Sequence, residues 1–169
     1  MKPRRQKIFD GRIFKVFKGN KTLPGGREAY FEEVKHPGAA LIIPFIGRRI
    51  VFIRQYRGVI GKYIWELPAG ILEKGETPYA CAKREIAEET GYRVGRLKRI
   101  GFIYTTPGFC NEKIYIFKAE CSYKRESQRD EDEMIKVRKF TRNEIHSLFK
   151  EGKIIDSKTI AALAFSDIL

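Results

Sequence analysis

Three closely spaced glutamates are the part of the sequence with the clearest chemical meaning. Glu85, Glu88 and Glu89 are three and four residues apart, so a helix would place the three carboxylates on one face. Like charges at this spacing repel, and Arg84 alone cannot neutralise three of them. Divalent cations that prefer oxygen ligands can, and an all-oxygen site favours Mg²⁺ or Mn²⁺ over zinc. The alternative for this helix alone is an acidic face exposed to solvent.

A wider pattern surrounds these glutamates. It reads G-x5-E-x7-R-E-U-x-E-E-x-G-U, where U is a bulky and usually apolar residue. The pattern resembles the Nudix box, the signature of hydrolases that cleave a nucleoside diphosphate linked to another group. Its positions are held by Gly70, Glu76, Arg84, Glu85, Ile86, Glu88, Glu89, Gly91 and Tyr92. Only Tyr92 is unusual, because the last position is more often aliphatic.

The resemblance implies metal ligands. Glu85 and Glu89 would bind metal directly. Glu88 would add a ligand or hold a metal-bound water, and the backbone carbonyl of Ala69 would complete the shell. More than one ion per site is expected, since two or more divalent ions can bridge a pyrophosphate, neutralise its charge and activate water.

The same resemblance assigns supporting roles to three other residues. Arg84 and Glu76 would form an ion pair that anchors the preceding loop to the helix and fixes the carboxylate rotamers. Gly70 would allow the loop backbone to approach the metal closely.

Motifs outside the box resemble the ADP-ribose pyrophosphatase branch of the family. Pro107 lies 15 residues beyond Tyr92, where that branch carries a proline, and Gly108 follows it. The run R-Q-Y-R, from Arg54 to Arg57, resembles a strand-end motif whose last arginine meets the substrate phosphates, a task that suits a bidentate guanidinium. The residues expected to bind substrate are Arg54, Arg57, Pro107 and Gly108. The alternative is that these segments are ordinary strand and turn structure.

Hydrolysis also needs a base that positions and deprotonates water. In this branch the base lies on a loop after the box, and residues 130–133 form an acidic cluster there. Glu131 is the preferred base and Glu133 the second choice, with Glu88 as the further catalytic residue through its metal-bound water.

Residues 1–37 are expected to form a small N-terminal antiparallel β ribbon. Strand patterns before and after the turn Leu23–Gly26 predict it, and it resembles the dimerising domain of the same branch. The likeness implies a homodimer. Tyr30 and Phe31 in this ribbon are the expected aromatic platform for adenine.

The glutamates require a helix to position them, and the sequence predicts one over Pro78–Thr90. Thr77 suits the N-cap, Pro78 the first helical position and Gly91 a left-handed C-terminal end. The expected buried stripe is Tyr79, Ala82 and Ile86.

Residues 38–169 are expected to form the hydrolase domain, with an α/β fold. Strands are predicted at 39–44, 49–54, 63–66, 99–104, 113–120 and 134–140, and helices at 143–150 and 159–168. Leu67–Gly70 is expected to be a turn or loop. Together with the resemblance, these elements predict an α/β/α sandwich with a mixed sheet.

Length and composition limit the class of protein. The chain has 169 residues, with 43% hydrophobic and 33% charged, which suits one principal globular domain and excludes a disordered chain. No apolar run reaches the roughly 18 residues that a spanning helix needs, and the basic N-terminus does not resemble a secretory signal. The cytoplasm is therefore the expected compartment. Three cysteines and two histidines predict neither a disulfide framework nor a zinc site.

The formal charge of +13 makes anions the partners to consider first. It is uneven: residues 1–63 carry +11, while residues 64–92 carry −3. The leading hypothesis is metal-dependent hydrolysis of ADP-ribose to AMP and ribose 5-phosphate. One alternative is another nucleoside diphosphate sugar or an oxidised nucleotide as substrate. The other, an RNA-binding module without catalysis, is disfavoured because every glutamate of the box is present.

Overall fold

The computed structural model describes residues 5–124 and 135–169, which pack as two compact units. One unit contains the chain up to Gly38 together with Tyr104–Lys113, and the other contains Ala39–Ile103 and Ile114–Leu169. The division of function between residues 1–37 and 38–169 stays a prediction.

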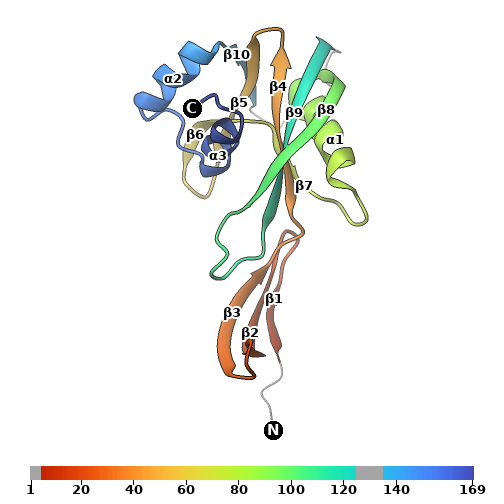
Figure 1. Cartoon of the computed structure of the whole chain (residues 1–169), viewed down its shortest axis with the longest axis vertical. Helices are drawn as coiled ribbons and strands as arrows, with labels where there is room; N and C mark the ends of the chain where they lie inside the picture. Colours follow the sequence, from red (N-terminus) through yellow and green to blue (C-terminus); the bar gives the residue numbers. More distant parts are fainter. Residues whose placement is uncertain (1–4, 125–134) are drawn as a thin grey trace. The chain divides into compact units, whose positions relative to one another are not determined.

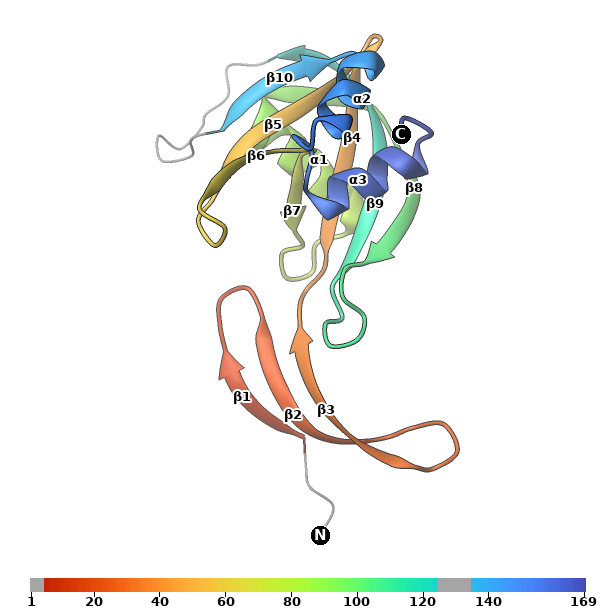
Figure 2. The same cartoon turned by 90° about the vertical axis from the view of Figure 1, so that its left-hand side faces the viewer.

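The first unit is a three-stranded antiparallel sheet in the order β1-β2-β3, which confirms the expected ribbon. Figure 2 shows the three strands as one curved sheet. Its strands are β1 (Gln6–Asp10), β2 (Lys15–Thr22) and β3 (Glu28–Lys35). The segment 104–113 packs beside β3, because Val34 donates its N–H to the carbonyl of Phe109 at 2.7 Å and accepts from Asn111 at 3.2 Å.

The second unit is built on a seven-stranded mixed sheet. The main path runs β10-β5-β4-β9-β8, with β6 added to β5 and β7 added to β4. Strands β4 and β9 are parallel, from Ala39↔Ile114 to Phe45↔Glu120, and the other described pairings are antiparallel. The strands are β4 (Ala39–Ile46), β5 (Arg49–Arg57), β6 (Lys62–Glu66), β7 (Ala69–Ile71), β8 (Tyr92–Tyr104), β9 (Lys113–Lys124) and β10 (Lys136–Phe140).

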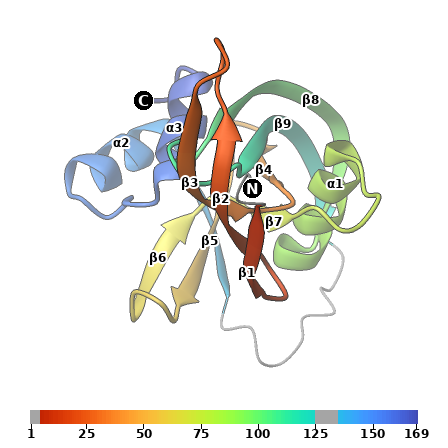
Figure 3. The ribbon, with the colours of Figure 1, turned by 90° about the horizontal axis from the view of Figure 1, so that it is seen from below.

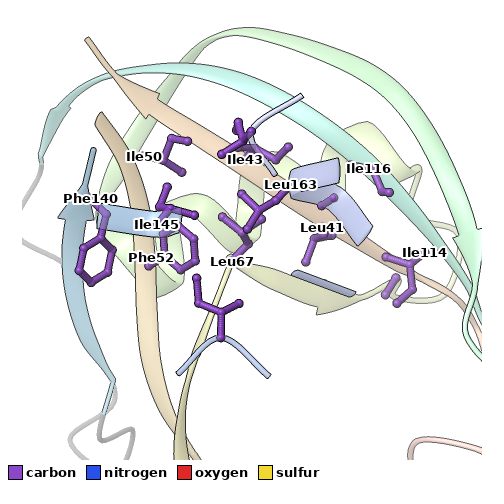
Figure 4. Packing of buried hydrophobic residues seen from close by; sticks show 14 residues of the cluster. Leu41, Ile43, Ile50, Phe52, Leu67, Ile114, Ile116, Phe140, Ile145 and Leu163 are labelled. Atoms are coloured by element: carbon purple, nitrogen blue, oxygen red, sulfur yellow. The ribbon is translucent and has the colours of Figure 1, made fainter. Parts of the chain in front are cut away.

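Helices cover both faces of this sheet. Figures 1 and 3 show α1 (Pro78–Thr90) on one side of the strands, and α2 (Arg142–Lys150) and α3 (Ser157–Phe165) on the other. Strand β4 is buried on both faces because its alternate side chains enter two cores. Leu41 and Ile43 belong to the cluster that also contains Phe52, Phe140 and Leu163, on the α2 and α3 side (Figure 4). The predicted α/β/α sandwich with a mixed sheet is confirmed.

Two local predictions were wrong. The supposed loop before the helix contains strand β7, which pairs Ala69 with Leu41 along the part of β4 that β5 leaves unpaired. Three residues are too few to show a strand pattern. Tyr79 is 47% exposed, because it lies in the first turn of α1 and packs only edge-on against Phe117; Cys81 is buried in its place.

The helices of the described residues are all too short or too polar to cross a membrane.

Candidate active site

Helix α1 places the three glutamates at different depths. It has the predicted bounds and caps: the hydroxyl of Thr77 accepts from the N–H of Ala80 at 3.2 Å, and Gly91 ends the helix with φ of 73°. Glu85 and Glu89 are only 8% and 9% exposed. The side chain of Glu88 is 58% exposed. Two of the three carboxylates on this helix face are therefore buried, and that of Glu88 is exposed to solvent.

Arg84 lies at the centre of the carboxylates. Its Nε and Nη2 donate to the two carboxylate oxygens of Glu76, each at 3.0 Å. Its Nη1 donates to Glu85 at 2.6 Å and to Glu88 at 3.0 Å, and Nη2 also reaches the carbonyl of Ile71 at 3.2 Å. One guanidinium thus holds the loop before the helix, the end of β7 and two of the three glutamates.

The pKa values of Glu76 and Glu85 shift in opposite directions. Hydrogen bonds from Arg84 lower the pKa of Glu76 to about 2, and those same bonds raise the pKa of Arg84. Burial raises the pKa of Glu85, and the neighbouring charge of Arg84 offsets only part of this rise. Glu85 is therefore a buried carboxylate that a further cation would stabilise.

Strand β7 lies so close to the carboxylate of Glu85 that any side chain at Gly70 would clash with it. A Cβ added to Gly70 would lie 1.7 Å from Oε1 of Glu85 and 1.9 Å from its Cδ. The N–H of Ala69 donates to Oε2 of Glu89 at 3.0 Å. The sequence-predicted residues Ala69, Gly70, Glu85 and Glu89 thus come together, although the role of the Ala69 carbonyl as a ligand stays a prediction.

These residues fit a hard divalent cation in their chemistry. Carboxylate oxygens are the donors that Mg²⁺ and Mn²⁺ prefer, and the buried Glu85 lies in a space that a Cβ on Gly70 would fill. In residues 5–124 and 135–169, no three acidic, histidine or cysteine side chains are grouped so that they could hold one ion. Arg84 pairs with both Glu85 and Glu88. Each of these two bonds uses one carboxylate oxygen, so the other oxygen of Glu85 and of Glu88 is not bonded to Arg84.

The two arginines of the R-Q-Y-R run lie on opposite faces of β5. Arg57 donates through Nε and Nη2 to the carboxylate of Glu66, both at 2.6 Å. Arg54 instead lies over the rings of Tyr63 and Trp65, at 5.4 and 6.0 Å from their centroids. Their odd spacing along a strand explains the difference. The expected substrate-binding roles of Arg57, as the phosphate ligand, and of Arg54 stay predictions.

Sequence reasoning missed a buried ionic cluster around Glu66. This Glu66 cluster contains Arg57, Glu66, Asp156 and Lys158: Lys158 pairs with Glu66 and with Asp156, the latter at 2.9 Å. Burial alone would raise the pKa of Glu66, but the hydrogen bonds from Arg57 and the charge of Lys158 outweigh it and hold the pKa below its usual value. Asp156 showed a signal, since an acidic residue before an apolar helical run suits an N-cap. The pairing of residues 66 and 158 showed none.

The first unit brings together three other predicted residues. Phe31, Pro107 and Gly108 line a cavity of about 390 Å³, together with the cationic side chains of Arg5 and Lys21. Tyr30 neighbours Phe31 on β3, so its side chain points to the other face of the strand, and it is 60% exposed. Of the two aromatic residues expected to bind adenine, Phe31 lines this cavity and Tyr30 does not.

The two expected bases, Glu131 and Glu133, lie outside the described residues.

Comparison with known proteins supports the pattern in the sequence. Residues 35–163 match the NUDIX domain model. The chain is 39% identical to the methanol dehydrogenase activator of Bacillus methanolicus, covering 95% of this chain and 88% of that one. It is 36% identical to the ADP-ribose pyrophosphatase of Bacillus subtilis strain 168, covering 95% and 89%.

A solved structure agrees with the fold. The crystal structure of an ADP compounds hydrolase superimposes with a TM-score of 0.81 over 99% of this chain and 93% of that one, at 20% identity. This similarity shows the fold. The domain match and the two relatives, which align over nearly the whole chain, show the family: the protein belongs to the Nudix family.

Proposed function

We propose that the protein hydrolyses the pyrophosphate bond of ADP-ribose, giving AMP and ribose 5-phosphate. The observation that carries the proposal is the three box glutamates of α1, of which Glu89 bonds to β7, in a chain 36% identical to an ADP-ribose pyrophosphatase over almost its full length. Metal-dependent hydrolysis needs carboxylate oxygens that bind the metal. They are available from the buried Glu85 and Glu89 and from the exposed Glu88.

In this proposal Glu85, Glu88 and Glu89 hold Mg²⁺, or Mn²⁺ in its place, with more than one ion per site. Bound ions would neutralise the charge of the pyrophosphate and supply an activated water. Glu76 fixes Arg84 through two hydrogen bonds, so Arg84 can release Nη1 from the carboxylates and stay anchored to the loop. Glu131, or Glu133, would accept the proton of the attacking water.

Each unit, taken by itself, offers one candidate substrate contact. Arg57 has two of its five N–H groups on Glu66, and its side chain is 40% exposed, so its outer edge can meet the substrate phosphates. The cavity lined by Phe31, Pro107 and Gly108 offers an aromatic side chain to a nucleobase. Its cations Arg5 and Lys21 both pair with Glu33, which also lines the cavity.

The exposed apolar side chains of the first unit support a homodimer as the working form. They include Ile8, Phe9, Ile13, Phe14 and Tyr30. Exposed apolar side chains of this size are candidates for burial at a protein interface. We place the enzyme in the cytoplasm, with a small nucleoside diphosphate sugar and neither nucleic acid nor membrane as its partner.

A substrate panel tests the proposal. Purified protein is incubated with Mg²⁺ and ADP-ribose, GDP-mannose, UDP-glucose or an oxidised nucleoside triphosphate, and kcat/KM is compared. The highest value is expected for ADP-ribose. Preference for another member of the panel would keep the chemistry and replace the substrate, whereas no turnover of any of them would refute the proposed activity. RNA binding that weakens steeply with added salt, together with no turnover of any substrate, would favour an RNA-binding module.

A further inference from the structure

The Glu66 cluster contains a carboxylate that is completely buried. Glu66 is 0% exposed, at the end of β6, and a charged group so deep requires compensation by paired cations. It receives two hydrogen bonds from Arg57 and a third from Lys158. Two acidic and two basic side chains make the cluster neutral, while Arg57 alone projects substantially to the surface.

Helix α3 carries Lys158 at a position that its own chemistry disfavours. The residue lies in the first turn, where the partial positive charge of the helix repels a cation. The N-cap Asp156 compensates in part, at 2.9 Å from the ammonium. The side chain is only 18% exposed and reaches Glu66, 92 residues earlier in the chain. Its placement is explained by the carboxylates of Glu66 and of the N-cap Asp156.

The same helix end also binds the backbone segment that leads into β7, the strand beside Glu85 and Glu89. The hydroxyl of Thr159 donates to Asp156 at 2.6 Å and accepts from the N–H of Leu67 at 2.9 Å. Two residues later, the N–H of Ala69 donates to Glu89. A short run of backbone therefore joins Glu66, which holds Arg57, to the amide that holds Glu89.

We propose that Glu66 and Lys158 are positioning residues that fix the guanidinium of Arg57 for the substrate phosphates. Glu66 binds the Nε and Nη2 edge of Arg57 and so directs the remaining N–H groups outward. Lys158 balances the charge of Glu66, so that the carboxylate stays ionised and in place when Arg57 also engages an anion. The inference rests on the proposed function, because it takes Arg57 as a phosphate ligand.

Glu66→Gln gives a test in which two explanations predict opposite signs. If Glu66 acted only through its charge, removing a negative group beside an anion site would strengthen substrate binding. If it positions Arg57, the loss of a charge-assisted bidentate contact should raise KM about tenfold, with kcat changed less than about threefold. An unchanged or lower KM overturns the inference.

A second variant keeps the test decisive if Glu66→Gln unfolds at the assay temperature, which thermal unfolding will show. Lys158→Met retains the length of the side chain and removes its charge. Both substitutions should raise KM in the wild-type background and change it less than about twofold in Arg57→Lys, because residues that act through one group are not additive. Equal effects in both backgrounds overturn the inference.

A binding measurement separates this inference from the proposed activity. If the wild-type protein cleaves no nucleoside diphosphate derivative, the proposed function fails, and titration calorimetry with inorganic pyrophosphate and Mg²⁺ still tests Arg57. About tenfold weaker binding by Glu66→Gln than by wild type supports the positioning role. Equal affinity, or no binding by wild type, overturns it. Lys153→Met is the matched control, since Lys153 is 60% exposed and pairs only with the exposed Glu151 among the described residues.

Discussion

Replacing Gly70 with alanine should disable the site through a single methyl group. The new Cβ would lie 1.9 Å from Cδ of Glu85, and ordinary contact begins at 3.4 Å, so the carboxylate must withdraw by about 1.5 Å. A displacement of about 1 Å in a reacting constellation can cost on the order of 100-fold in rate. We therefore expect kcat/KM for ADP-ribose with Mg²⁺ to fall at least about 100-fold.

The fold should survive this change. Gly70 is not among the glycines with positive φ, so alanine suits its backbone, and the atoms that clash belong to a side chain that can turn away. The melting temperature is expected to fall by only a few degrees, and affinity for Mn²⁺ in titration calorimetry should fall with activity. Gly58→Ala is the control, because its Cβ meets open space. If Gly70→Ala kept kcat/KM and Mn²⁺ affinity within about threefold of wild type, the close packing of β7 on Glu85 would not matter for function.

Three further predictions follow from the same geometry. Glu89→Gln should abolish turnover with little change in melting temperature, since its amide oxygen can still accept from Ala69; unchanged kcat would remove Glu89 from the metal ligands. Chelation with EDTA should stop hydrolysis, and added Mg²⁺ or Mn²⁺ should restore it; turnover that persists in EDTA would contradict metal dependence. The pKa of Glu76 falls from 4.5 to about 2 on folding, so its ion pair stabilises the fold above about pH 4.5 and this contribution disappears as the pH falls toward 2. In Glu76→Gln the melting temperature should therefore depend less on pH between about pH 4.5 and 2. An unchanged dependence would refute the stabilising role of the Glu76 ion pair.

The sequence predicted the parts of the site that depend on local spacing. Helix α1, its caps and the common location of Glu85 and Glu89 follow from residues within one short segment. The pair of Arg84 and Glu76 is also present, eight residues apart. The pattern could not show strand β7, whose three residues pair because β4 leaves an edge open.

Contacts between distant segments were beyond sequence reasoning. Glu66 and Lys158 are separated by 92 residues, and only the packing of α3 near the end of β6 brings them together. Arg54 and Arg57 belong to one motif, and the alternation of side chains along β5 places them on opposite faces of the strand. A sequence motif alone does not show on which face of a strand each of its side chains lies.

Analysis of the products tests the central claim most directly. Micromolar enzyme is incubated with ADP-ribose and Mg²⁺ in water enriched in ¹⁸O, and the products are separated and identified by mass spectrometry. The account predicts equal amounts of AMP and ribose 5-phosphate, with the heavy oxygen in one of the two phosphates and turnover lost in Glu89→Gln. Absence of AMP, or equal activity in Glu89→Gln, would contradict it.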